Sequence, residues 1–98
     1  MMRVEFADCD LERICTDEAH RLRLPFAIIK AARRKLIQLE AASSERDLMN
    51  LRGLNYKRLH GSREGQCQVW INHQYRIIFT LSDGNPPVIT ILEIGDPH

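Results

Sequence analysis

Residues 57–79 read KRLHGSREGQCQVWINHQYRIIF, and the pattern of this stretch decides the fold. A basic turn punctuated by glycines gives way to strict alternation, in which apolar side chains occupy every second position from Cys67 to Ile71. The alternation resumes at Tyr75 after a short polar segment. A period of two predicts β-strands, and the polar segment between the two runs predicts a hairpin.

Two hairpin registers are compatible with these residues. A two-residue turn at 72–73 would pair Val69 with Arg76 and place a charge among core residues. A three-residue loop over 72–74 pairs Val69 with Ile77 instead, so that the apolar set shares one face and Arg76 lies on the other. Because an unpaired buried charge is costly, we prefer the three-residue loop.

The remainder of the chain predicts helices packed on a small sheet. Val88 to Ile94 is nearly all apolar and β-branched, which predicts an inner strand covered on both faces. The fold class is therefore α+β, with an N-terminal strand and two to three helices on a small, mainly antiparallel sheet, in one domain over residues 1–98. The other predicted elements are a strand at 3–6, a short helix at 11–15 capped by Asp8 or Asp10, a long amphipathic helix at 26–42 and a short helix at 45–50 capped by Ser43 or Ser44.

Charge is distributed unevenly, although the formal net charge is only +1. Residues 21–35 carry six basic side chains and no acid, and residues 52–63 carry four basic side chains and no acid. Two local basic patches suit contacts with RNA phosphates, which depend on local rather than net charge. The alternative for the long helix is a charged face that is simply solvated.

Composition excludes several classes of protein. Hydrophobic residues make up 44% and charged residues 28% of the 98 residues, and no apolar run approaches the ~20 residues that span a bilayer. The N-terminus lacks the apolar stretch of a signal peptide, so we expect a cytoplasmic protein without membrane contact. Cys9, Cys15 and Cys67 form no C-x-x-C pair, so we expect half-buried thiols and no metal or other cofactor.

The runs LHGSREG at 59–65 and VWINHQYRIIF at 69–79, followed by a late acid and a terminal histidine, resemble the RelE/HigB superfamily of bacterial toxins, in particular its HigB, or plasmid-maintenance killer, branch. The resemblance implies a RelE-like fold and the toxin of a type II toxin–antitoxin module, whose partner is a helix-turn-helix antitoxin. It also implies a ribosome-dependent endoribonuclease. Such toxins enter the A site of the 30S subunit and cleave mRNA without a metal, through attack of a ribose 2′-hydroxyl on the adjacent phosphate.

The resemblance also implies roles for individual residues. Arg76 matches the strand arginine of the family and is expected to hold the scissile phosphate, because its planar fork can bind two oxygens at once. The alternative for Arg76 is a structural ion pair with Glu93 or Asp96, and the alternative for Arg63 is to stabilise its turn. The expected catalytic set is Arg76, His60, Asp96 and His98, and the expected RNA or phosphate contacts are Lys57, Arg58, Arg63 and Trp70.

One departure from the family pattern stands at Pro97, where the family has a tyrosine between the acid and the histidine. The departure favours loss of activity, and two rival functions remain open. The chain could be a same-fold toxin of the ParE branch, which acts on DNA gyrase, or a degenerate module that binds ribosome or antitoxin without cleaving RNA.

Overall fold

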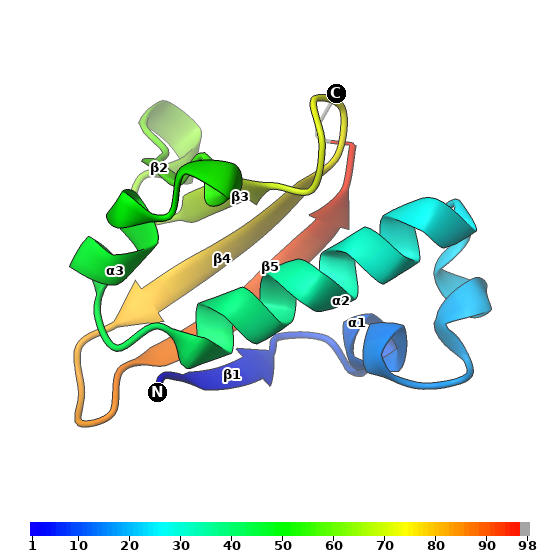
Figure 1. Ribbon diagram of the computed structural model, residues 1–98, viewed down its shortest axis with the longest axis horizontal. Helices are drawn as coiled ribbons and strands as arrows, with labels where there is room; N and C mark the ends of the chain where they lie inside the picture. Colours follow the sequence, from blue (N-terminus) through cyan, green and yellow to red (C-terminus); the bar gives the residue numbers. More distant parts are fainter. Residues whose placement is uncertain (97–98) are drawn as a thin grey trace.

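The computed structural model describes residues 1–96, which form a five-stranded sheet covered by helices on one face. All neighbouring strands are antiparallel except β1 and β5, which confirms the mainly antiparallel α+β prediction. Figure 1 shows β1 at one edge of the sheet and β2 at the other. The spatial order is β1 (Arg3–Phe6), β5 (Val88–Gly95), β4 (Arg76–Ser82), β3 (Cys67–Trp70) and β2 (Lys57–Arg58).

The second and third helices lie within one residue of their predicted bounds, whereas the first begins two residues early, at Cys9, and gives way to a 3-10 turn over Arg13–Cys15. The helix α2 (Phe26–Ala41) starts directly after Pro25 and lies along one face of the sheet in Figure 1. Asp8 caps α1 (Cys9–Glu12), and Ser44 caps α3 (Glu45–Asn50). Within residues 1–96, no helix is long and apolar enough to cross a membrane.

The core lies between α2 and the sheet. The predicted amphipathic helix buries five apolar residues along one face, and they pack with inward-facing side chains of β3, β4 and β5. The helix contributes Ile28, Ile29, Ala32, Leu36 and Leu39, and the strands contribute Val69, Ile77, Phe79, Ile89, Ile91 and Ile94.

The β3–β4 hairpin has the predicted three-residue loop. Val69 pairs with Ile77, and the Ile71 amide donates to the Tyr75 carbonyl at 2.9 Å. The side chain of Asn72 organises the loop, because its Oδ1 accepts the backbone N–H groups of Gln74 and Tyr75, each at 2.8 Å.

The last strand differs from the prediction. The helices cover one face of β5 only, and Glu93 on the other face is exposed. A β-bulge interrupts its pairing with β4, so that Ile78 pairs with Glu93 while the next residue, Phe79, pairs with Ile91. Without the bulge, alternation from Ile91 would turn Glu93 into the core. The extra residue, Leu92, turns Glu93 outward and Ile94 inward.

Candidate nucleic-acid interface

The sheet face opposite the helices, here called the open face, carries the polar side chains of the hairpin. Two adjacent rows cross it. The first row runs Lys57, Gln68, Ile78, Glu93, and the second runs Trp70, Arg76, Gly95. The rows are two residues apart along each strand, or about 7 Å. Ile78 is only 2% exposed although it lies on this face, so the surrounding side chains cover it and the open face is a packed surface.

Arg76 is half-buried at the start of β4, and its guanidinium is held on two sides. The group lies over the indole ring of its cross-strand partner Trp70, at 4.1 Å from the ring centroid. Its Nη1 donates to the carbonyls of Asn72 at 2.6 Å and Tyr75 at 3.1 Å, and its Nη2 donates to the carbonyl of His73 at 2.9 Å. These contacts fix both the plane and the rotation of the guanidinium.

One edge of the Arg76 guanidinium makes no hydrogen bond to residues 1–96. Three of its N–H groups are used by the loop carbonyls, whereas Nε and the second Nη2 hydrogen make no hydrogen bond to the described part of the chain. Among residues 1–96, no buried side-chain nitrogen or oxygen lacks a partner, so Nε of this half-buried residue is accessible to solvent. Two parallel N–H groups on one edge have the geometry for bidentate binding of a carboxylate or phosphate.

Arg63 belongs to the same face. It lies in a turn between Gly61 and Gly65, which both have positive φ, at 70° and 88°, a conformation that glycine adopts without strain. The Arg63 Nη2 donates to Glu93 Oε2 at 2.9 Å, and Nη1 donates to Gln66 Oε1 at 3.0 Å. Glu93 therefore pairs with Arg63, and the guanidinium of Arg76 meets backbone carbonyls instead.

Lys57 and Arg58 are neighbours on β2 but face opposite sides of the sheet. Lys57 pairs with Gln68 on the open face and is exposed, whereas Arg58 pairs with the core residue Cys67. The Arg58 guanidinium forms a two-point ion pair with Glu45 of α3, with Nε at 2.6 Å and Nη2 at 2.5 Å from the carboxylate oxygens. This pairing raises the pKa of Arg58 and lowers the pKa of Glu45.

The Glu45 carboxylate has a second donor in the hydroxyl of Tyr56, at 2.7 Å. Burial, followed by the hydrogen bonds to Cys67 and Glu45, raises the pKa of Tyr56 and keeps its hydroxyl protonated. The network joins α3 to the sheet. A phosphate at Arg58 would have to compete with the Glu45 carboxylate.

His60 lies apart from Arg76. Its side chain is exposed, and its Nδ1 is 3.9 Å from Glu64 Oε2. His60 lines a groove of about 500 Å³ together with Arg58 and Ser82, at the end of β4, whereas Arg76 begins that strand. Within residues 1–96, no hydrogen bond or ion pair joins His60 to Arg76.

Asp96 lies beside the loop that holds Arg76. The residue before it, Gly95, pairs with Arg76, and the side-chain Nε2 of Gln74 donates to Asp96 Oδ2 at 3.1 Å. The structure thus brings together Trp70, Arg76 and Asp96 at one end of the open face. The predicted catalytic residue His98 and the departure at Pro97 lie outside the described residues.

Three residues of this site were not predicted from sequence. Asn72 stands in the N-x-x-Y-R part of the hairpin, and an asparagine in a tight loop is the signal that predicts such a side-chain cap. Gln74 gives no signal, because its contact with Asp96 joins segments distant in sequence. From sequence, Glu93 is expected only as a possible partner for Arg76. Nothing in the apolar run indicates the bulge that turns its side chain outward.

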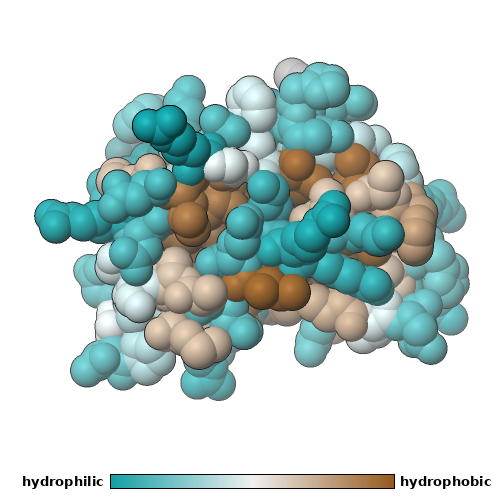
Figure 2. Space-filling model, in the orientation of Figure 1, coloured by the Kyte–Doolittle hydropathy of each residue, from teal (hydrophilic) through white to brown (hydrophobic). Residues whose placement is uncertain are grey.

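The basic residues of α2 divide into two groups. Arg33 donates to the carbonyls of Ile14 at 2.5 Å and Thr16 at 2.7 Å, and Lys35 donates to the carbonyl of Gly53 at 3.0 Å. These two side chains tie neighbouring segments to the helix. Lys30 and Arg34 are exposed on the solvent side, where Figure 2 shows hydrophilic side chains interrupted by apolar patches.

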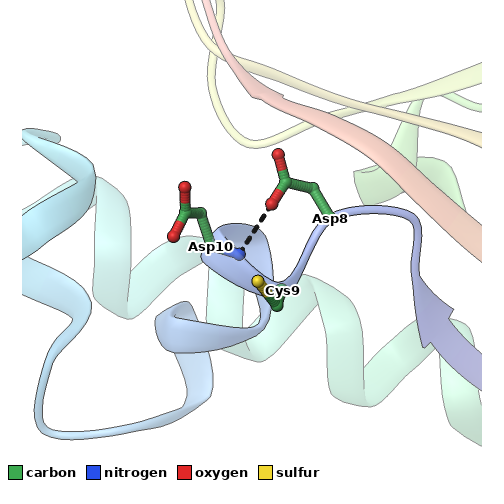
Figure 3. A group of neighbouring side chains, drawn as sticks. All are labelled: Asp8, Cys9 and Asp10. Carbon is green, nitrogen blue, oxygen red and sulfur yellow. Dashed lines mark hydrogen bonds between the residues drawn. The ribbon is translucent and has the colours of Figure 1, made fainter.

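One group of possible metal ligands lies within residues 1–96. The side chains of Asp8, Cys9 and Asp10 are exposed, with ligand atoms within 4.8 Å of one another (Figure 3). Asp8 Oδ1 accepts the backbone N–H of Asp10 at 2.8 Å, as a helix cap does, and acids are favoured in the first turn of a helix. Capping explains this group. Cys9 and Cys15 are exposed, contrary to the prediction of half-buried thiols, and Cys67 is buried.

Comparison with known proteins identifies the family. Residues 4–98 match the family described as RelE-like toxin of type II toxin–antitoxin system HigB. Toxin HigB-1 of Vibrio cholerae serotype O1 is 36% identical over 97 residues, which cover 99% of this chain and 98% of the relative.

Solved structures share the fold at lower identity. The YoeB–YefM complex from Staphylococcus aureus has a TM-score of 0.65 and 17% identity, covering 100% of this chain and 99% of the matched chain. YafQ from Escherichia coli strain BL21(DE3) has a TM-score of 0.60 and 14% identity, covering 99% of this chain and 94% of the matched chain. With the sequence match over nearly its whole length, the chain belongs to the HigB family of RelE-like toxins of type II toxin–antitoxin systems.

Proposed function

We propose that this toxin is a ribosome-dependent mRNA endoribonuclease whose open face binds the mRNA backbone in the A site of the 30S subunit. The observation that carries the proposal is the edge of the Arg76 guanidinium that residues 1–96 leave without a hydrogen bond. The exposed Lys57 lies on the same sheet face, in the neighbouring row. Two parallel N–H groups match two non-bridging oxygens of a phosphate. Arg63 lies on the same face but is paired with Glu93, which makes it a secondary phosphate contact. The Trp70 ring offers a surface for stacking.

In the proposed reaction, the 2′-oxygen of one ribose attacks the adjacent phosphorus while the bond to the 5′-oxygen of the next nucleotide breaks. A base accepts the proton of the 2′-hydroxyl, and an acid protonates the departing 5′-oxygen. The products are a 2′,3′-cyclic phosphate and a 5′-hydroxyl. Arg76 stabilises the additional negative charge that develops on the phosphate in the transition state.

Proton transfer is assigned to Asp96 and His98, whereas His60 lies too far along the sheet from Arg76 to act on the same phosphate. Asp96 has the most direct support, because it lies beside the loop that carries Arg76. His60 would contact the RNA only if the RNA continues from Trp70 along β3 toward the groove near Ser82. Arg58 is the weaker phosphate contact, since Glu45 already occupies two of its donors.

The proposal includes a helix-turn-helix antitoxin as the protein partner. It also includes a cytoplasmic location, because the ribosome and the antitoxin of such a toxin are both cytoplasmic. Support for the antitoxin comes from membership of the family and from the heterotetrameric YoeB–YefM toxin–antitoxin complex of Staphylococcus aureus, which has the same toxin fold.

The test uses purified toxin and ribosomes programmed with a defined mRNA. We expect cuts that need the ribosome, products with a 2′,3′-cyclic phosphate and a 5′-hydroxyl, and no cut where a single 2′-deoxyribose replaces the ribose at the site. Cleavage that persists at the deoxy position would overturn the 2′-hydroxyl mechanism. Stalled but intact mRNA would indicate a binding module, and inhibition of gyrase supercoiling without RNA cleavage would indicate the ParE-like alternative.

A further inference from the structure

We propose that Trp70 and Asn72 are positioning residues, which hold the guanidinium of Arg76 in the one orientation that presents its Nε–Nη2 edge to a phosphate. The proposal rests on the proposed function, because it explains how the phosphate-binding group is preorganised. It assigns no chemical step to either residue.

Trp70 determines the plane of the guanidinium. The two residues are directly opposite one another on β3 and β4, and the guanidinium carbon is 4.1 Å from the centroid of the indole ring. Stacking of an arginine on tryptophan is attractive, and more so when the pair is partly shielded from water, as in this half-buried pair. A long arginine side chain otherwise has many rotamers to lose when it binds a ligand.

Asn72 determines the rotation of the guanidinium within that plane. Its Oδ1 accepts the N–H groups of Gln74 and Tyr75, each at 2.8 Å, which folds the loop tightly. In this fold, the carbonyls of residues 72, 73 and 75 converge on Arg76. The carbonyls accept two hydrogen bonds from Nη1 and one from Nη2, which leaves the N–H of Nε and one N–H of Nη2 without a partner in residues 1–96.

The first experiment separates positioning from binding. Single-turnover cleavage on programmed ribosomes gives the rate at saturating toxin and the toxin concentration for half that rate. We expect Trp70→Leu to lower the saturating rate about tenfold with little change in the half-saturating concentration. Trp70→Phe keeps an aromatic face and should recover most of the rate. Met49→Ala, which removes an exposed apolar side chain on α3, serves as the control and should leave both quantities unchanged.

Equal losses in Trp70→Leu and Trp70→Phe, or a change confined to the half-saturating concentration, would overturn the positioning role of Trp70. For Asn72, the conservative variant is Asn72→Asp, which keeps an oxygen acceptor for both loop amides. We expect Asn72→Ala to lose saturating rate and Asn72→Asp to retain more of it. Identical rates for the two variants would overturn the role of Asn72. Thermal unfolding of each variant verifies that it is folded.

A second readout does not depend on cleavage. Trp70 is the only tryptophan of the chain, so its fluorescence reports directly on the stacked pair. We expect Arg76→Gln to shift the emission of folded protein, and Arg46→Gln on α3 to leave it unchanged. An unshifted spectrum in Arg76→Gln would overturn the stack in solution. If Arg76→Gln shifts the emission but the wild type cleaves no mRNA, then the proposed nuclease function fails while the arrangement of Trp70 and Arg76 stands.

Discussion

At residue scale, a guanidinium carries five N–H groups, and in Arg76 three of them donate to backbone carbonyls of the β3–β4 loop. These carbonyls belong to a tight turn, in which the Tyr75 carbonyl also accepts the Ile71 amide. The same contacts orient the edge that is left for a ligand. The loop and the candidate phosphate site are therefore one structure, joined through a single side chain.

Replacing Arg76 by lysine keeps the charge but removes this geometry. An ammonium group is a compact point charge and cannot bridge the loop carbonyls while presenting two parallel N–H groups. We expect Arg76→Lys to lose at least a hundredfold of the cleavage rate, or about 2.7 kcal/mol of transition-state stabilisation. The rate is measured in single turnover on programmed ribosomes. A lysine variant with nearly normal rate would show that charge alone is sufficient.

Glu45 gives a prediction about pH. The hydrogen bond from Arg58, followed by that from Tyr56, lowers the pKa of Glu45 below its ordinary value of 4.5. A carboxylate with a lowered pKa in the folded state stabilises the fold fully above the pKa of the unfolded state, and the contribution is lost as the pH falls through the folded-state pKa. We expect Glu45→Gln to be less stable than wild type at pH 7, with a difference that shrinks as the pH falls below 4.5.

Urea unfolding of both proteins across this pH range provides the measurement. A difference that is constant or grows on acidification would contradict the ion-pair network around Glu45. Arg46→Gln, on the same helix but without a carboxylate partner among the described contacts, is the matched control.

At the scale of elements, α2 shows how a basic run separates into structural and exposed charges. Arg33 and Lys35 bind backbone carbonyls of neighbouring segments, whereas Lys30 and Arg34 are exposed to solvent. We expect Lys30→Gln with Arg34→Gln to weaken ribosome binding and to reduce its salt dependence, without altering the thermal midpoint. Arg33→Gln should lower the midpoint instead. Binding is measured by sedimentation at several salt concentrations, and unchanged salt dependence in the double variant would exclude α2 from the ribosome contact.

The elements also show how far the sequence predicts the fold. The hairpin register follows from alternation, because only one register buries Val69 with Ile77 while keeping Arg76 out of the core. The bulge in β5 is different. Its run of apolar residues reads as continuous, and only the pairing with β4 shows that Leu92 is an extra residue and that Glu93 faces outward. Long-range pairing of this kind has no local signal.

At the scale of the molecule, stability and the candidate site lie on opposite faces of one sheet. The helix side holds the large buried residues, among which Phe79 is 0% exposed with its ring centroid 6.1 Å from that of Tyr56. We expect Phe79→Ala to lower the free energy of unfolding by about 3–5 kcal/mol, a large share of the total for a domain of this size. Urea unfolding measures this loss. A loss below about 1 kcal/mol would contradict the assigned core.

The site was predicted less completely than the fold, and the reasons lie in the tertiary arrangement. Arg76 and Trp70 could be assigned to one face from the hairpin register, and the structure places them in contact. The position of His60 depends on how the turn after β2 packs, and it lies near the groove at the Ser82 end of β4 rather than beside Arg76. In the sequence, Arg58 is indistinguishable from the other basic residues of the turn. Its ion pair with Glu45 forms only in the folded chain, because the two residues are 13 positions apart.

The most direct test of the nuclease proposal is induced expression of wild type, Arg76→Ala and the matched control Arg46→Ala in a bacterial host, followed by primer extension on an abundant mRNA. We expect growth arrest and new 5′ ends within coding sequence for the wild type and for Arg46→Ala. For Arg76→Ala, present at equal soluble level, we expect neither. Growth arrest with the same new 5′ ends in the Arg76→Ala strain would contradict the assignment of Arg76 as the phosphate-binding residue.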